Sequence, residues 1–231
     1  MLLYLSSNSR PDIAFAVNQC TRFNHYAKLC QEKAVKRIRR YLKATREQGL
    51  ILKPNEDMNL ELYADANFTG LWNIENPDDA VSVRSRTGYV VTLSGLPVSW
   101  SSKLQTEIAT STMMAEYIAL STGMRELLPI INVYGEICDA LSIKRSDESK
   151  VVRAFEDNEG ALNLATKEMP KVTPSSKHFA VKYHWFRSKL NDPEYNIKVL
   201  PVDTSVQKAD IFTKGLGKTE FQNKRRLLMG W

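Results

Sequence analysis

The clearest alternation of apolar and polar residues lies in "LELYADANFTG", residues 60–70. Its first six positions alternate in type: Leu60, Glu61, Leu62, Tyr63, Ala64 and Asp65. A period of two is typical of a β-strand, in which successive side chains point to opposite faces. The pattern therefore predicts a strand that ends at Asp65 and turns this acid away from the leucines. Asp65 then fits either a solvated turn or a metal-binding set.

Hydrophobic spacing along the rest of the chain predicts further elements. Helices are expected over residues 10–23, 32–45, 111–141, 159–167, 175–190, 206–214 and 218–231. Strands are expected over residues 49–52, 60–65, 86–103 (a hairpin turning at Ser94–Gly95), 150–158 and 196–202. Pro129 lies inside the long helix, so a kink or a break is expected there. Residues 69–85 read as a loop.

The order of these elements predicts an α/β fold, in which helices pack on a mixed sheet. Residues 1–55 are expected to form a helical segment, and residues 56–231 the domain that contains the sheet. The chain has 231 residues, of which 43% are hydrophobic, so it is long and apolar enough to bury a core.

Charge, cysteine content and hydropathy limit the kinds of partner, cross-link and location that fit this sequence. A net charge of +6 and a pI of about 9.1 favour an anionic partner. The three cysteines show no CxxC spacing, which indicates reduced thiols of an intracellular protein rather than disulfides or a zinc site. No apolar run approaches about 18 residues, so no membrane span is expected.

Four carboxylates recur where strands end or helices begin. Asp65 and Asp157 end predicted strands, whereas Glu116 and Asp210 lie near helix starts. These positions meet at one rim of an open α/β sheet, where four acids would repel one another. Hard divalent cations such as Mg²⁺ or Mn²⁺ would relieve that repulsion. Because the chain has 26 acids, each taken alone also fits a solvated surface role.

The surrounding motifs make the set more specific. In order along the chain they are "YADA", "RSRTGYVVTLSGLPVSWSSKLQ", "STMMAEYIALS", "FEDNEGALNLA", "SKHFAVKYHWFR" and "KADIFTK". Together they resemble the ribonuclease H domain at the end of the copia-type (Pseudoviridae) retrotransposon polyprotein, over nearly the whole chain. The stretch from "LLYLSSNSRPDIAFAVNQCTRF" to "AVKRIRRYLKAT" resembles the end of the reverse transcriptase just upstream, its thumb-like helical region.

The resemblance implies a ribonuclease H fold with a five-stranded mixed sheet. It implies hydrolysis of the RNA strand of an RNA–DNA hybrid with two Mg²⁺ ions, for which Mn²⁺ can substitute. Asp65, Glu116, Asp157 and Asp210 are the implied catalytic metal ligands. The other implied partner is the rest of the reverse transcriptase polyprotein, in a cytoplasmic virus-like particle or in the nucleus.

The chain departs from the family pattern at three places. Met114 stands where the family commonly has a second glutamate, two residues before Glu116. No histidine precedes Asp210 at the expected distance; His178 and His184 are substitutes, and each also fits a packed or surface role. A Tyr-x-Asp-Asp turn is absent from the sequence, since "NPDD" at residues 76–79 does not match it, so no polymerase activity is expected.

Contacts with nucleic acid are expected from two groups of residues. The helix over 32–45 carries a basic face that includes Lys36, Arg37 and Arg40, which fits either backbone phosphates or plain solvent. By resemblance, Ser111 and Thr112 lie at the corner that faces the RNA sugar. Asn158 fits the same groove and also fits a helix N-cap.

Two other functions fit the same sequence. A fragment of the polyprotein could bind nucleic acid without cutting it, because the finger and palm regions that help to hold a hybrid are absent. The fold also serves DNA cutting and strand transfer, as in integrases and junction resolvases, although the "AEY" and "ADIFTK" contexts point away from that function.

Overall fold

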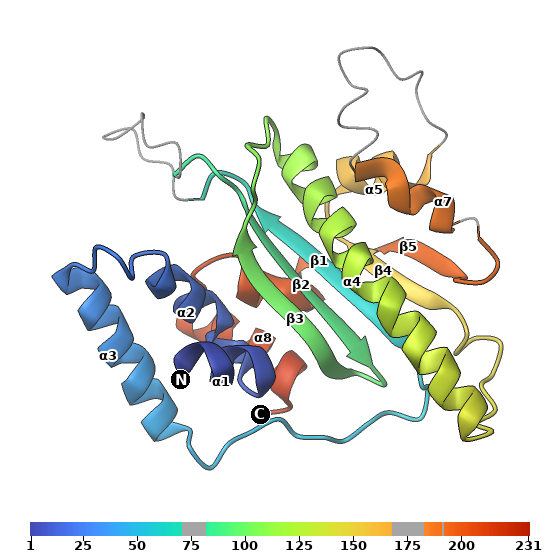
Figure 1. The fold of residues 1–231 in the computed structure, drawn as a ribbon, viewed down its shortest axis with the longest axis horizontal. Helices are drawn as coiled ribbons and strands as arrows, with labels where there is room; N and C mark the ends of the chain where they lie inside the picture. Colours follow the sequence, from blue (N-terminus) through green and yellow to red (C-terminus); the bar gives the residue numbers. More distant parts are fainter. Residues whose placement is uncertain (71–81, 168–182, 191) are drawn as a thin grey trace.

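In the computed structural model, the described residues are 1–70, 82–167, 183–190 and 192–231 (Figure 1). The helices are α1 Leu2–Asn8, η1 Pro11–Ile13, α2 Ala14–Thr21, α3 Leu29–Ala44, α4 Thr112–Ala140, α5 Glu159–Thr166, η2 His184–Phe186, α7 Arg187–Leu190, η3 Thr204–Val206, η4 Lys208–Phe212 and α8 Lys218–Met229, where η denotes a 3₁₀ helix. The strands are β1 Leu60–Asn67, β2 Arg86–Leu93, β3 Leu96–Leu104, β4 Val152–Glu156 and β5 Ile197–Pro201.

The strands form one mixed sheet in the order β3-β2-β1-β4-β5. β1 pairs antiparallel with β2, and β2 pairs antiparallel with β3. β1 pairs parallel with β4, and β4 pairs parallel with β5. This arrangement, with helices on both faces, confirms the predicted α/β fold with a five-stranded mixed sheet.

Each face of β1 packs into a different hydrophobic core, as its alternating sequence predicts. Leu60, Leu62 and Ala64 are buried under α4, together with Tyr117 and Leu120 of that helix. On the opposite face, buried residues from the C-terminal part of the chain pack on the sheet: Tyr63, Val90, Ile211, Phe212 and Leu228. Asp65 follows Tyr63 by two positions on the same face of β1, and Thr213, just beyond η4, donates its hydroxyl to it.

The hairpin turn at Ser94–Gly95 is confirmed. Both residues have positive φ angles, 51° and 82°, as the type I′ turns of tight hairpins require. β1, in contrast, does not end at Asp65: it continues to Asn67, because its pairing with β2 extends to the pair Asn67 and Arg86.

Two further local predictions concern residues 49–52 and Pro129. Residues 49–52 form no strand: Ile51 donates its backbone N–H to the carbonyl of Met229 at 3.1 Å, and no neighbouring strand pairs with the segment in the described structure. The helix around Pro129 does not break, since α4 is continuous over 29 residues. Its buried face, which includes Leu127 and Tyr134, packs on both sides of the proline and holds the helix together.

The C-terminal helical predictions differ in kind and length. The segment 206–214 forms short 3₁₀ helices rather than an α-helix, and α8 ends at Met229 because Gly230 adopts a left-handed conformation with φ 87°. Only residues 183–190 of the expected helix 175–190 lie within the described residues, where they form η2 and α7.

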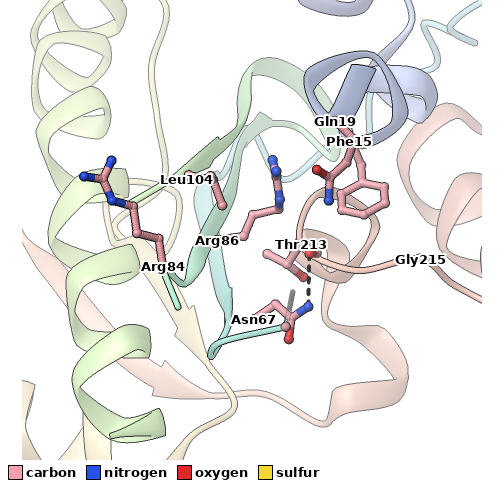
Figure 2. A pocket seen from close by; sticks show the side chains of 9 residues that line it. Phe15, Gln19, Asn67, Arg84, Arg86, Leu104, Thr213 and Gly215 are labelled. Carbon is pink, nitrogen blue, oxygen red and sulfur yellow. Dashed lines mark hydrogen bonds between the residues drawn. The ribbon is translucent and has the colours of Figure 1, made fainter. Parts of the chain in front are cut away.

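The N-terminal helices pack against the sheet domain. Trp100 of β3 donates its indole N–H to the carbonyl of Ser6 in α1 at 2.6 Å. Figure 2 shows Phe15 and Gln19 of α2 close to Arg86 of β2. The predicted domain boundary near residue 55 stays a prediction. Within the described residues, every helix is too short or too polar to cross a membrane.

Candidate active site

Three of the four predicted carboxylates meet at one end of the sheet. Asp65 comes from β1, Glu116 from the second turn of α4, and Asp157 follows β4 directly. One carboxylate oxygen from each lies within 4.8 Å of the other two. The sequence places these residues 51 and 41 positions apart. The fold brings them together because β1 and β4 are parallel neighbours and α4 packs on β1.

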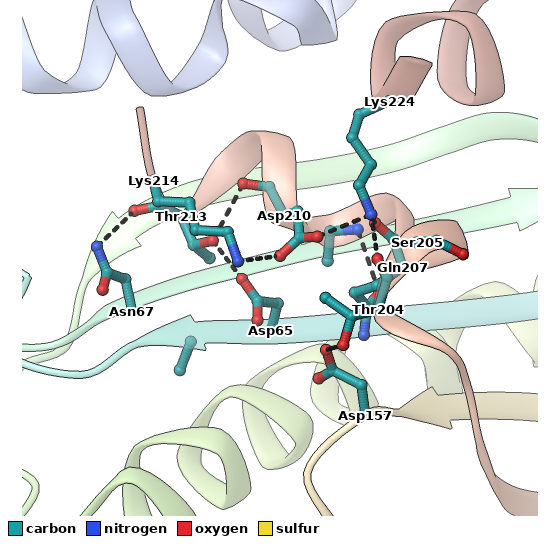
Figure 3. Close-up of polar contacts among 12 residues, drawn as sticks. Asp65, Asn67, Asp157, Thr204, Ser205, Gln207, Asp210, Thr213, Lys214 and Lys224 are labelled. Atoms are coloured by element: carbon teal, nitrogen blue, oxygen red, sulfur yellow. Dashed lines mark hydrogen bonds and ion pairs between the residues drawn. The ribbon is translucent and has the colours of Figure 1, made fainter. Parts of the chain in front are cut away.

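Asp65 is almost fully buried, with 4% of its surface exposed. Its Oδ2 accepts a hydrogen bond from the hydroxyl of Thr213, just beyond η4 (Figure 3). Burial raises the pKa of Asp65 to about 6, opposed by the Thr213 hydrogen bond and by the charge of Lys214. Asp65 was expected to end a strand as an exposed acid or a metal ligand, and its burial removes the solvated-turn alternative.

Glu116 is held from two sides. Ser111 caps α4 by accepting the N–H of Met114 at 3.1 Å, which fixes the start of the helix. The Oε2 of Glu116 then accepts the backbone N–H of Ala66, next to Asp65, at 2.6 Å. Burial and the nearby charges of Asp65 and Glu156 raise the pKa of Glu116.

Asp157 is the most accessible member of the cluster. It is half-buried and accepts a hydrogen bond from the hydroxyl of Thr204 at 3.1 Å (Figure 3). Asn158 caps α5 by accepting the N–H of Ala161 at 2.9 Å, so its predicted N-cap role is confirmed. The cap fixes the backbone directly after Asp157.

Glu156 is an acid of this site that the sequence motifs did not single out. It is fully buried, and its Oε1 accepts the N–H of Asn158 at 3.0 Å, while its Oε2 has no hydrogen-bond partner among the described residues. Burial raises the pKa of Glu156, and the charges of Asp157 and Asp65 add to the effect. In the sequence, Glu156 could have been noticed because it and Asp157 are two consecutive acids at the end of a predicted strand.

Asp210 lies outside the three-acid cluster. Its two oxygens contact the ammonium groups of Lys214 and Lys224, at 2.6 Å and 2.8 Å (Figure 3). Lys224 is itself buried and also donates to the carbonyl of Gln207 at 2.9 Å. Asp210 is thus charge-compensated by the chain itself, and its role as a metal ligand stays a prediction.

A glycine allows η4 to approach this part of the sheet. A Cβ on Gly88, which pairs with Asp65 across β1 and β2, would lie 2.6 Å from Cγ2 of Thr213 and 2.7 Å from Cβ of Phe212. Only a residue without a side chain therefore permits the contact that brings Thr213 onto Asp65.

The cluster fits a divalent cation. Asp65, Glu116 and Asp157 offer hard carboxylate oxygens at one point, and the buried carboxyl of Glu156 lies beside them. Among the described residues, the hydrogen bonds to Asp65, Glu116 and Asp157 come from hydroxyl and backbone N–H groups, so they carry no positive charge. Such a donor set is typical of Mg²⁺ or Mn²⁺.

The predicted nucleic-acid contacts lie in two places. Ser111 and Thr112 lie at the start of α4, near Glu116, and Thr112 is exposed. The basic residues of α3 lie on a helix beyond α2, on the side of the molecule away from α4 (Figure 1). The three basic residues, Lys36, Arg37 and Arg40, are exposed. Lys36 forms an ion pair with Glu32 at 2.5 Å. Their binding roles stay predictions.

The two residues discussed as family departures have packing roles here. Met114 is partly buried against the main core. His184 shares a 2.6 Å hydrogen bond with the hydroxyl of Tyr117, consistent with the packed role. His178 and the "NPDD" segment at residues 76–79 lie outside the described residues.

Comparison with known proteins identifies the relatives of this chain. The retrovirus-related Pol polyprotein from transposon RE1 of Arabidopsis thaliana is 34% identical over 215 residues, which cover 93% of this chain. The corresponding polyprotein from transposon TNT 1-94 of Nicotiana tabacum is 32% identical over 227 residues, which cover 98% of this chain. The chain belongs to the copia-type retrotransposon Pol family.

The aligned region is a small part of those Pol polyproteins, 13% of the RE1 protein and 16% of the TNT 1-94 protein. No protein-family model matches the chain. Among solved structures, LC11-RNase H1 in complex with an RNA/DNA hybrid has a TM-score of 0.44 and 16% identity, over 67% of this chain and 94% of that chain. That similarity is weak, and membership of the copia-type Pol family rests on the polyprotein relatives.

Proposed function

We propose that this chain is a divalent-metal-dependent ribonuclease H that cuts the RNA strand of RNA–DNA hybrids. The observation that carries the proposal is the meeting of Asp65, Glu116 and Asp157 within 4.8 Å, in a cluster whose hydrogen bonds among the described residues come from uncharged donors. Membership of the copia-type Pol family supports the choice of substrate, because a hybrid is the product of reverse transcription.

The residues of the site would hold two Mg²⁺ ions, with Mn²⁺ as a substitute. The proposed ligands are Asp65, Glu116 and Asp157. Asp210 would be a further ligand if Lys214 and Lys224 moved away from its carboxylate. When bound, the ions would supply an activated water and stabilisation of the leaving oxygen of a phosphodiester.

The remaining groups position these ligands. Thr213 orients Asp65, the N–H of Ala66 orients Glu116, and Thr204 orients Asp157. Lys214 lies on the exposed side of the site, because its side chain is 39% exposed while it contacts Asp210. We assign to it an electrostatic role toward the substrate phosphates.

In the cell, the proposed partners are the hybrid and the remainder of the Pol polyprotein, in virus-like particles of the cytoplasm or in the nucleus. The basic residues of α3 and the start of α4 would add contacts with phosphates and with the RNA sugar. The proposed chemistry requires no polymerase centre in this chain.

The decisive experiment compares the wild type with Asp65→Asn on four substrates: a hybrid, single-stranded RNA, duplex RNA and duplex DNA. The wild type should cut only the RNA of the hybrid and only with Mg²⁺ or Mn²⁺, and Asp65→Asn should lose this activity while keeping its fold. Asp57→Asn is the matched control, because Asp57 is an exposed turn residue beyond the opposite end of β1.

Equal cleavage by the wild type and Asp65→Asn would refute the role of Asp65. Hybrid binding without any metal-dependent cleavage would instead support a non-catalytic binding fragment. Cleavage of duplex DNA would favour the DNA-cutting alternative.

A further inference from the structure

A cavity outside the carboxylate cluster is lined by Thr213, the residue that donates its hydroxyl to Asp65. It has a volume of about 130 Å³ and lies between α2, the paired ends of β1 and β2, and the turn after η4 (Figure 2). Its lining includes Phe15, Gln19, Asn67, Arg86, Thr213 and Gly215. Thr213 connects the cavity to the site, because its hydroxyl donates to Asp65.

Arg86 is a buried cation in this cavity, with 2% of its surface exposed. Its Nη1 donates to Oδ1 of Asn18 at 2.6 Å and to Oγ of Ser102 at 3.1 Å, and its guanidinium lies 5.2 Å from the ring centre of Phe15. Its Nη2 has no hydrogen-bond partner, and no carboxylate pairs with Arg86 within the described ranges.

A buried guanidinium without a counter-ion is unfavourable, because burial removes its hydration and nothing replaces it. Burial, together with the charge of Arg22, lowers the pKa of Arg86 to about 10, so the group is still protonated at neutral pH. An anion in the cavity would supply the missing charge and the missing acceptor. A phosphate suits it, because arginine donates to phosphate oxygens through two parallel N–H groups.

The position of the cavity matches a strand that passes through the active site. Asp65 and Asn67 lie two residues apart on the same face of β1, about 7 Å apart along the strand, which is comparable to the distance between neighbouring phosphates of one nucleic-acid strand. Arg86 pairs with Asn67 across the sheet. Among the described residues, the amide of Asn67 donates only to the carbonyl of Thr213, at 3.5 Å, so it can turn toward a ligand.

We propose that this cavity binds a backbone phosphate of the substrate next to the phosphate at the carboxylates, with Arg86 and Asn67 as the donors. The proposal rests on the function proposed above and adds a positioning site to it. It also gives the N-terminal segment a role in substrate binding, because α2 supplies Phe15 and Gln19 as one wall and Asn18 as the anchor of Arg86.

The test measures hybrid binding without divalent metal, as a function of salt, for the full chain and its variants. Arg86→Gln should weaken binding about tenfold or more, as loss of a charged hydrogen bond implies. It should also lower the slope of log affinity against log salt by about 0.7 to 0.9, the value for one phosphate contact. The control is Lys144→Gln, which removes one exposed charge beyond the far end of α4 and should change neither quantity.

A second variant guards against misfolding of Arg86→Gln. Gln19→Glu places a carboxylate on the cavity wall beside Arg22, which already donates to Gln19 at 3.0 Å. This variant should keep or increase the melting temperature and yet weaken hybrid binding, because the new carboxylate competes with the phosphate. Asn67→Ala should weaken binding less than Arg86→Gln, because it removes a neutral donor.

The outcomes separate this proposal from the proposed function. If the wild type cuts hybrids while folded Arg86→Gln and Gln19→Glu bind them with wild-type affinity and salt slope, the phosphate site is wrong and the nuclease function stands. Another outcome would also overturn the proposal: inorganic phosphate stabilises the wild type but not Arg86→Gln, while both bind the hybrid equally well. The cavity would then be a site for a free anion. If the wild type binds no hybrid, the proposed function fails first.

Discussion

Replacing Asp65 by asparagine should stabilise the metal-free protein at neutral pH while it removes the proposed activity. Asp65 is buried beside other acids, and its pKa is raised from 3.8 to about 6. An asparagine has nearly the same shape but no charge, so the variant keeps the packing and removes the repulsion. Its oxygen can still accept the Thr213 hydroxyl.

The magnitude follows from the pKa. A rise of roughly two pH units, at about 1.4 kcal/mol each, means that ionising Asp65 costs the native state about 3 kcal/mol above pH 6. Below pH about 4 the carboxyl is protonated in both folded and unfolded states, and the cost disappears. The wild type therefore loses stability relative to the variant as the pH rises through 6. A weaker hydrogen bond from Thr213 reduces the gain, so we expect about 1–3 kcal/mol at pH 7.5.

The assay is urea unfolding followed by tryptophan fluorescence in EDTA, at pH 4 and at pH 7.5. Asp65→Asn should exceed the wild type in free energy of unfolding at pH 7.5 and match it at pH 4. Addition of Mg²⁺ should stabilise the wild type and leave the variant unchanged, because a ligand stabilises only the state that binds it. Asp57→Asn, with an exposed carboxylate, should follow the wild type at both pH values.

Two results would refute this reasoning. One is an Asp65→Asn protein that is no more stable than the wild type at pH 7.5 in EDTA. The other is a stability difference that does not change with pH, because a charge effect must vanish once the carboxyl is protonated in both states.

Further predictions concern the surroundings of the site. Gly88→Ala should destabilise the protein by about 1–3 kcal/mol in a thermal melt and should reduce cleavage, because the new Cβ overlaps Thr213. In the same melt, the control Gly135→Ala should be neutral or stabilising, because no atom lies within 4 Å of its new Cβ. Lys224→Met should cost about 3 kcal/mol in urea unfolding, because it removes a buried partner of Asp210. In calorimetry, the affinity for Mg²⁺ should decrease when the pH is lowered below about 6, because protons then compete with the metal for carboxylates whose pKa is raised. An affinity that does not change with pH would contradict the assigned ligands.

Much of the fold was predictable because it depends on local patterns. The alternation around Asp65 and the Ser94–Gly95 turn follow from the period of side chains along a strand and from the backbone angles that a turn requires. The strand expected at residues 49–52 failed because a strand also needs a partner, which composition does not reveal. Pro129 failed as a helix breaker because packing of α4 on the sheet outweighs one lost hydrogen bond.

The candidate site was predictable only as a set of motifs. "YADA", "AEY" and "EDN" identify Asp65, Glu116 and Asp157, which the fold brings together. Arg86 carries no such signal, because its importance comes from burial and from partners distant in sequence. Glu156 lies inside the "EDN" motif, but its burial beside other acids becomes apparent only in the fold. Arg86 meets Asn18 across 68 positions of the chain.

The sequence by itself determined the order of the elements, which side of β1 is buried under α4, and the family to which the chain belongs. Only the tertiary structure decided that Asp210 is neutralised by two lysines, that Gly88 lets Thr213 reach Asp65, and that a buried arginine lies beside the acids. The reason is physical: periodicity is a property of neighbouring residues, whereas desolvation and charge pairing depend on distances through space.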